Sequence, residues 1–416
     1  MDFDDTPEEA AFRAEAHAWL SANTAPRGDG EGSSAILTEE AGAIASAKAW
    51  QARKADAGWA CITWPREYGG RGGSAIESVI WGQEESKFSI PPNIFTIGLG
   101  MAGPTLMAHG TAEQRERWLP KMVRGDEVWC QLFSEPAAGS DLAGLRTRAE
   151  RDGDEWVVNG QKIWTSGAQH SEWGILVTRT DPNVPKHAGI TYFVLDMRSP
   201  GVEIRPIKQI TGSADFNEVF FNDVRIPDEN RISEVGNGWA VAITTLMNER
   251  ASIGGGGVGL GGGVRDLIEL ARSSPTAGGG CALDSTAVRE KIADCYVRSK
   301  GLQYTSYRTL TALSRGQTPG PEGSIGKLVA AKMQQEVASL ALDLLGASGT
   351  IADEDVAAAS AEWQQAYLWA PGIRIAGGTD EIMRNIIAER VLRLPPEPRI
   401  DKEIPFRDVP GEARSS

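Results

Sequence analysis

The chain has 416 residues, of which 41% are hydrophobic and 24% charged, and its formal net charge is −14. This length and composition are those of an ordinary globular protein of two or three domains, and the negative charge without a long basic run disfavours nucleic acid or an anionic membrane surface as the main partner. The acidic, amphipathic N-terminus lacks the features of a signal or transit peptide, and no apolar run is long enough to span a membrane. We therefore expect a cytoplasmic protein.

The cysteine and histidine patterns predict neither disulfides nor a metal site. Cys61, Cys130, Cys281 and Cys295 are scattered, with no C-x-x-C pair, so we interpret them as reduced thiols. The four histidines occur singly and no H-E-x-x-H is present, so no metal ligand is predicted.

Residues 1–126 have a mainly helical pattern, which predicts an N-terminal helical domain. Thr6 suits a helix N-cap, with Pro7 at the first helical position and Glu9 at the capping-box spacing. Thr111 and Gln114 repeat this spacing before a second helix. Between them, the Pro and Gly content of WPREYGGRGG (64–73) predicts a loop.

Residues 127–232 change to short runs rich in β-branched and aromatic residues. Asp152-Gly153 and Asn159-Gly160 are typical hairpin turn pairs, because both contain residues that tolerate positive φ. We predict a middle β-domain, built as a sandwich or barrel of antiparallel strands.

Residues 233–394 return to the helical period and predict a C-terminal helical domain. Apolar residues recur at helical spacing in two stretches. They are Val288, Ile292, Cys295 and Leu302 in one, and Val329, Met333, Val337, Leu340 and Leu344 in the other. The Pro-rich tail, 395–416, cannot form a regular helix, so it either wraps a surface or is disordered.

A glycine cluster follows residue 253, and Gly254, Gly256 and Gly259 spell G-x-G-x-x-G. A dinucleotide-binding fingerprint would follow a strand and open a helix, whereas the residues before this cluster have the pattern of a helix already under way. Eight glycines cost a helix roughly 6–8 kcal/mol of intrinsic propensity. The cluster is therefore either part of a closely packed helix or a break in one, and we expect no NAD binding.

Four motifs, in this order, resemble the acyl-CoA dehydrogenase family of flavoproteins. They are GWACITWPREYGGRGG (58–73), QLFSEPAAGSD (131–141), NGQKIWTSGA (159–168) and GGTDEIMRNIIAERVL (377–392). The resemblance covers about residues 5–394 and implies a C-terminal four-helix bundle after the N-terminal helical and middle β-domains. It also implies oxidation of an acyl-CoA to the trans-2-enoyl-CoA, with FAD as cofactor and an electron-transfer flavoprotein as acceptor.

The resemblance also implies which residues contact FAD and coenzyme A. Those on the two motif strands are Leu132, Phe133, Ser134, Trp164, Thr165 and Ser166. Thr379 and Glu381 match positions near the phosphate and ribityl region, where a carboxylate acts more readily on ribose or through its backbone than on phosphate. Ser140 matches a serine that contacts the coenzyme A arm. Taken alone, Trp164 would be a core aromatic and Ser140 a turn cap.

The catalytic base departs from the commonest family pattern. Many members carry a glutamate at the position of Gly377, whereas one branch places it directly before an arginine on the first helix of the last domain. Here Glu249 precedes Arg250, so the resemblance implies Glu249 as base and Gly377 as a backbone donor to the thioester carbonyl. Without that context, Glu249 would be a solvated helix carboxylate.

The acyl group and the assembly are predicted less directly. Ser252, Ile253 and Gly256 share a helix face with Glu249, and two are small, so we hypothesise a bulky acyl group such as a steroid side chain. The family's R-x-x-F and Q-x-x-G-G elements are missing from 271–280 and 343–349. We therefore leave open a homodimer, a homotetramer, a heterotetramer with a paralogous chain, a non-catalytic subunit, and an oxidase-like or monooxygenase-like relative.

Overall fold

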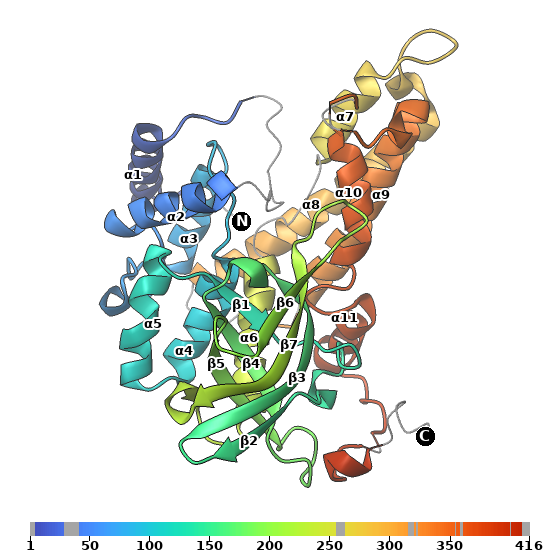
Figure 1. Cartoon of the computed structure of the whole chain (residues 1–416). Coiled ribbons are helices and arrows are strands. Elements are labelled where there is room, and N and C mark those ends of the chain that lie inside the picture. The colour runs from blue at the N-terminus through green and yellow to red at the C-terminus, as the bar shows by residue number, and fades with distance from the viewer. Residues whose placement is uncertain are drawn as a thin grey trace. The chain divides into compact units, whose positions relative to one another are not determined.

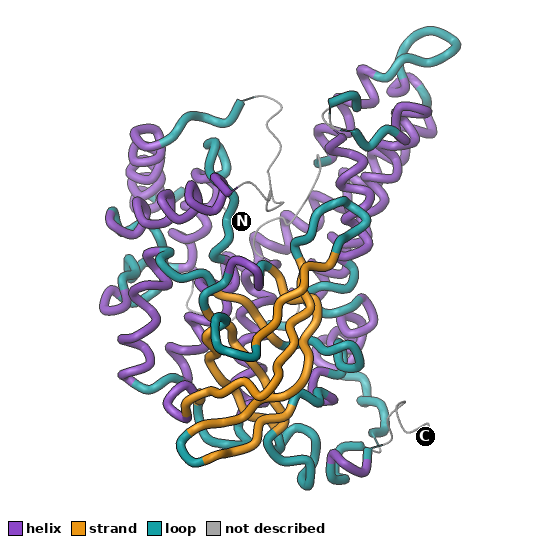
Figure 2. The backbone as a smooth tube through the Cα atoms, in the orientation of Figure 1, coloured by secondary structure: helices purple, strands orange, loops and turns teal. Residues whose placement is uncertain are grey.

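The computed structural model describes residues 5–28, 41–254, 263–314, 320–321, 323–353, 355–357, 361–399 and 401–409. Packing divides the chain into two compact units. We call residues 1–35, 73–90 and 253–395 the helical unit, and residues 36–72, 91–252 and 396–416 the sheet unit. The described strands all lie between residues 129 and 232, with helices before and after them (Figure 2). The predicted order of helical, β and helical domains is confirmed.

The sheet unit contains one sheet with eight described strands (Figure 1). They are β1 (Trp129–Leu132), β2 (Arg148–Asp152), β3 (Glu155–Ser166), β4 (Trp173–Arg179), β5 (Ile190–Asp196), β6 (Val202–Ile207), β7 (Phe216–Pro227) and β8 (Arg231–Ile232). Their order is β6-β7-β3-β2-β4-β5-β8, and β1 pairs with β4. The prediction of purely antiparallel strands was wrong in one respect, because β1–β4 and a single residue pair of β2–β4 are parallel.

Hydrophobic cores form on both faces of this sheet, since successive side chains of a strand point in opposite directions. In β4, Ile175 and Val177 belong to one core, which also contains Val241 of helix α6 (Gly238–Gly254), whereas Leu176 belongs to the other. The first core is completed by α4 (Gly103–His109) and α5 (Ala112–Arg124). The second is closed by side chains of β3 and β7. Helix α2 (Ala41–Asp56) packs on α5.

The two predicted hairpin turns have different outcomes. Asp152-Gly153 does form the turn between β2 and β3, where Gly153 has a φ of 64°. Asn159-Gly160 instead lies inside β3, at a register irregularity opposite β7, so that prediction was wrong. A Cβ on Gly160 would come within 2.5–2.8 Å of Thr147, so the glycine is needed for a close approach of backbone rather than for a turn.

The helical unit contains α1 (Pro7–Asn23), α3 (Ala75–Glu85), α7 (Val264–Ser273), α8 (Thr286–Ser314), α9 (Gly323–Leu345), α10 (Glu362–Ile373) and α11 (Asp380–Ile386). The capping boxes predicted at Thr6 and Thr111 are present at the starts of α1 and α5. Ile292 and Val337 from the predicted apolar stripes meet in one core with Trp363. Residues 1–126 contribute helices to both units, and the predicted domain boundaries stay predictions.

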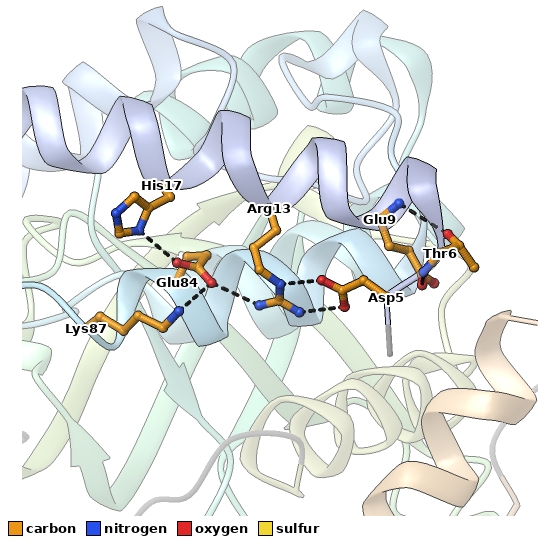
Figure 3. A network of polar contacts seen from close by, with 7 residues as sticks. All are labelled: Asp5, Thr6, Glu9, Arg13, His17, Glu84 and Lys87. Carbon is orange, nitrogen blue, oxygen red and sulfur yellow. Dashed lines mark hydrogen bonds and ion pairs between the residues drawn. The ribbon is translucent and has the colours of Figure 1, made fainter. Parts of the chain in front are cut away.

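A buried carboxylate joins α1 to α3 (Figure 3). The Glu84 side chain is 1% exposed and lies 2.9 Å from Arg13, 2.6 Å from Lys87 and 3.1 Å from His17. Burial raises the pKa of Glu84, but hydrogen bonds from its basic neighbours outweigh this effect and hold the pKa below its ordinary value. Charge pairing therefore fixes the position of the N-terminal helix against α3.

The tail packs on the loop between β4 and β5. Phe406 N donates to Val184 O at 2.9 Å, and its ring lies 3.8 Å from the guanidinium carbon of Arg179. Lys186, whose side chain is 3% exposed, forms ion pairs with both Asp141 and Asp401. Of the two alternatives for the tail, surface wrapping is the one found for residues 401–409.

Helix α6 runs through the start of the glycine cluster, as the sequence pattern before it predicted. Residues 255–262, including Gly256, lie outside the described residues, as do the side chains of Arg250, Ser252 and Ile253. The described helices include none with the length and apolarity needed to cross a bilayer. All four cysteines are free thiols, as predicted.

Candidate functional site

The ends of two motif strands are joined by a buried ion pair. Lys162 of β3 is 0% exposed, and its Nζ lies 2.8 Å from Glu135 Oε1 and donates to Phe133 O at 2.9 Å. Glu135 also accepts from the backbone N–H groups of Arg146 and Thr147, at 2.6 and 2.9 Å. These contacts fix the segment after β1 against β3.

The protonation of this pair follows from its surroundings. Burial lowers the pKa of Lys162, and the neighbouring Glu135 only partly offsets this effect. Burial also opposes ionisation of Glu135, but the charge of Lys162 and three hydrogen bonds hold the pKa of this carboxyl below its ordinary value. Arg179, buried nearby, has its pKa lowered to about 10, mainly by burial. Glu135 is therefore a structural carboxylate that remains ionised.

Trp164 is not a core aromatic. Its side chain is 57% exposed, and its φ of 60° lies in the left-handed region, where a bulky residue is strained by about 1–3 kcal/mol. Its ring meets Phe216 edge-on, with centroids 6.2 Å apart. The β3–β7 register is irregular between Lys162 and Thr165, and this irregularity turns the indole off the sheet.

The motif hydroxyls are not equally accessible. Ser134 and Ser166 are half-buried, and Ser134 O accepts from Ile163 N at 2.9 Å, which joins the two motif segments directly. Thr165 is 1% exposed, and its Oγ1 is buried with no hydrogen-bond partner. Leu132 and Phe133 are also buried, at 0% and 3% exposure. Ser134 and Ser166 are therefore the hydroxyls that a bound molecule could reach.

Helix α6 is attached to the sheet unit by a chain of buried hydroxyls. Thr245 Oγ1 lies 2.9 Å from Thr105 Oγ1 of α4 and 3.0 Å from Tyr192 OH of β5. Burial raises the pKa of Tyr192, so its hydroxyl stays protonated and available for hydrogen bonding. Because residues four apart share a helix face, this contact also fixes the direction of Glu249.

Glu249 is held by a residue of β1. Gln131 Nε2 donates to Glu249 Oε2 at 3.1 Å, so the glutamate lies beside the strand that leads directly into Leu132 and Phe133. Both Gln131 and Glu249 are half-buried. The sequence interpretation missed the role of Gln131 and of the Lys162–Glu135 pair, although all three residues lie in the quoted motifs or next to them.

Ser140 lies in an exposed turn anchored by its neighbour. The Asp141 carboxylate accepts from Lys186 Nζ at 2.8 and 2.9 Å, and Lys186 in turn meets the tail. The side chain of Ser140 is free to face a ligand, and no cap contact is recorded for it in the region described. The structure neither assigns nor excludes a coenzyme A contact here.

The remaining predicted residues belong to the helical unit. Gly377 and Gly378 have positive φ values of 67° and 98°, and Lys327 Nζ donates to Gly378 O at 2.6 Å. Thr379 Oγ1 caps α11 by accepting from Ile382 N, and the Glu381 side chain is 76% exposed. A hollow of about 260 Å³ is lined by Gln335, Pro371, Arg374, Ile375, Thr379, Asp380 and Glu381.

No metal centre is indicated by the described part of the chain, where no three His, Cys, Asp or Glu side chains lie close enough to hold an ion. Burial raises the pKa of the Cys61 and Cys130 thiols to about 12. These two cysteines are therefore inert core residues.

Comparison with known proteins agrees with this geometry over almost the whole chain. Family models of the acyl-CoA dehydrogenase N-terminal, middle and C-terminal domains match residues 6–126, 130–224 and 236–392. The acyl-CoA dehydrogenase IpdE1 of Mycobacterium tuberculosis is 39% identical over 394 residues, which cover 93% of this chain and 98% of the relative. Its counterpart in Mycolicibacterium smegmatis is 37% identical over 408 residues, covering 93% and 98%.

Solved structures give the same result. The chain resembles one in the ChsE4-ChsE5 complex from Mycobacterium tuberculosis, with a TM-score of 0.77 and 29% identity over 95% of this chain and 100% of the other. It also resembles one in the Tcur3481-Tcur3483 steroid ACAD, with a TM-score of 0.78 and 28% identity over 95% and 100%. Full-length sequence and fold similarity together show that the chain belongs to the acyl-CoA dehydrogenase family of oxidoreductases.

Proposed function

We propose that this enzyme uses FAD to oxidise an acyl-CoA thioester to the trans-2-enoyl-CoA, with Glu249 as the base. The observation that carries the proposal is the position of Glu249, whose carboxylate is hydrogen-bonded to Gln131 on the strand that continues into the predicted flavin-contacting segment. A solvated surface glutamate would have no reason to be held beside this strand.

The residues of the sheet unit fit a flavin. An exposed, strained indole at Trp164 offers a flat apolar surface, and the half-buried hydroxyls of Ser134 and Ser166 can hydrogen-bond to a polar ring edge. The orphaned Oγ1 of Thr165 shows that the polar environment here is incomplete in the chain alone. Bound FAD would supply the two-electron acceptor for the β-hydrogen, which leaves as hydride.

The chain's own part in the reaction is proton transfer. Glu249 accepts the α-proton of the thioester, so the C–H bonding pair becomes the new double bond as the β-hydride departs. The family resemblance predicts that Gly377 N–H polarises the thioester carbonyl, as an oxyanion donor would. General-base catalysis typically contributes about 10²–10⁴-fold, which sets the size of the expected defect.

Substitution of Glu249 tests the proposal. Glu249→Gln keeps the size and polarity of the side chain but cannot accept the proton, so bleaching of the flavin by acyl-CoA should slow at least ~10²-fold while flavin content is retained. Glu218→Gln is the matched control, because Glu218 also accepts a hydrogen bond from a glutamine, Gln161, at 2.9 Å. A Glu249→Gln rate within about threefold of the native rate would rule Glu249 out as base.

A companion variant tests the predicted geometry of Gly377. In the Glu249→Gln background, Gly377→Glu moves a carboxylate to the commoner family position. Partial recovery of flavin bleaching would support the prediction that both positions reach the same α-carbon. No recovery in a folded, flavin-containing protein would contradict it.

We also propose a bulky, steroid-type acyl group. The solved relative described as a steroid ACAD supports this, as do the small residues predicted to share the helix face of Glu249. A bleaching screen that includes butyryl-CoA, octanoyl-CoA and the CoA thioester of a saturated steroid side-chain acid tests it. A straight medium chain as the fastest substrate would contradict the steroid assignment.

For the assembly we propose a heteromer with a paralogous chain and an electron-transfer flavoprotein as acceptor. The missing R-x-x-F and Q-x-x-G-G elements and the two-component names of both solved relatives support an unlike partner. Light scattering with flavin quantitation tests this, and a fully loaded homotetramer from the chain expressed alone would contradict it. Reoxidation of the reduced flavin by air within seconds would favour the oxidase-like alternative.

A further inference from the structure

Gln131 lies where it can orient the carboxylate of Glu249. Strand alternation directs Cys130 and Leu132 into one core and Trp129 into the core that contains Val241 of α6. Gln131 therefore points toward the α6 side of the sheet, the same side as Trp129. Its amide meets Glu249 there with an N–O distance of 3.1 Å.

The orientation of the amide is set by chemistry. If the amide group were reversed, Gln131 Oε1 would lie against the carboxylate oxygen, and two acceptors would repel each other. With Nε2 toward Glu249, Gln131 Oε1 is buried and has no hydrogen-bond partner. A buried amide oxygen without a partner is costly. The amide thus keeps its donor on Glu249 at the expense of its own oxygen.

We propose that Gln131 is a positioning residue for the base: its amide holds Glu249 Oε2 so that Oε1 is directed at the substrate α-carbon. This inference rests on the proposed function of Glu249. No comparable role is assigned to Gln131 by the motif resemblance, because the residue was quoted only as the first letter of a motif.

Two effects of removing the amide oppose each other, and their sizes decide the outcome. Loss of a donor makes a carboxylate a slightly stronger base, which would speed proton transfer by about threefold. Loss of orientation acts the other way, since a misplacement of about 1 Å can cost ~10²-fold. We expect the loss to prevail, with a net fall of about tenfold or more in the limiting rate of flavin reduction.

The first test needs no turnover. Gln131→Met removes the donor but keeps the length of the side chain, and Gln131→Leu serves as a second variant if the first does not fold. Thermal unfolding of the native chain, each single variant and the Gln131→Met/Glu249→Gln double variant forms a cycle. A double shift smaller than the sum of the single shifts supports the contact. Strictly additive shifts would overturn it.

The second test measures stopped-flow flavin reduction by the steroid side-chain CoA thioester, with octanoyl-CoA as second probe. Gln131→Met should lower the limiting rate about tenfold or more and change the half-saturating concentration less than about threefold. In the Glu249→Gln background the same substitution should change the rate by less than about twofold, because its effect acts through Glu249. Gln161→Leu is the matched control, since it removes an amide–carboxylate hydrogen bond elsewhere on the sheet.

The outcomes separate this inference from the proposed function. If Glu249→Gln is slow but Gln131→Met is nearly native, Glu249 is the base and Gln131 does not position it. If Gln131→Met lowers the rate equally in both backgrounds, or no more than Gln161→Leu does, the positioning role is likewise overturned. If Glu249→Gln itself reduces its flavin at the native rate, the proposed base fails first.

Discussion

Removal of the buried lysine in β3 should destabilise the protein in a pH-dependent way. Lys162→Met fills similar space but leaves Glu135 without its counter-ion, which lies 2.8 Å from Lys162 Nζ. Breaking a buried pair by removing one partner costs about 3–5 kcal/mol. Two backbone N–H groups and the charge of Arg179 remain near Glu135, so we expect the lower end of this range. At ~2 °C per kcal/mol, the unfolding midpoint should fall by about 6 °C at neutral pH.

The pH dependence has a definite sign. In the native protein the pKa of Glu135 is lowered, so its ionised form contributes stability above the ordinary carboxyl pKa of 4.5, and this contribution is lost as pH falls. Without Lys162, burial is less opposed and ionisation becomes unfavourable, so the variant loses stability as pH rises. The deficit of Lys162→Met should therefore be largest near pH 7–8 and shrink toward about pH 4–5.

Thermal unfolding across this pH range is the assay. Glu135→Gln in the Lys162→Met background removes the unpaired charge and should restore part of the midpoint. Arg225→Met is the control, because its ion pair with Glu155 on the same sheet is about half exposed and should matter little. A Lys162→Met midpoint within ~1 °C of native at pH 7, or a deficit that does not depend on pH, would refute this reasoning.

Three further predictions concern other parts of the fold. Trp164→Gly should keep or slightly raise the unfolding midpoint by relieving up to ~1–3 kcal/mol of backbone strain, yet lower the bound flavin per chain; unchanged flavin content would argue against the flavin role. Truncation before Pro396 should lower the midpoint because Lys186 and Arg179 lose their tail partners, and an unchanged midpoint would show that the tail contributes nothing. Glu84→Gln should lower the midpoint at neutral pH, where the carboxylate with its lowered pKa contributes most, and the deficit should shrink as the pH is lowered; a constant deficit would contradict an ionic role.

Features that depend on neighbouring residues in the sequence were predicted well. The capping boxes at Thr6 and Thr111 are local hydrogen bonds between residues three apart, so the sequence alone specifies them. The order of helical, β and helical regions follows from the periodicity of apolar residues, which each segment carries by itself. The family motifs likewise survive as short contiguous strings. Their residue roles stay predictions.

Features that depend on distant residues were not predictable in the same way. Asn159-Gly160 has the local signature of a turn, but the close approach of Thr147 places it inside a strand. Lys162 occupies a strand position like any other, and its complete burial is possible only because Glu135, 27 residues earlier, supplies a counter-charge.

The candidate site shows the same division. The sequence by itself determined that a glutamate precedes an arginine on a helix and that a tryptophan ends a β motif. Only the tertiary structure decided that this helix packs on the sheet unit, that Gln131 reaches Glu249 across 118 residues of chain, and that Trp164 is turned outward. The physical reason is that hydrogen-bond pairing and burial are properties of the packed chain, because each requires a partner that local sequence does not specify.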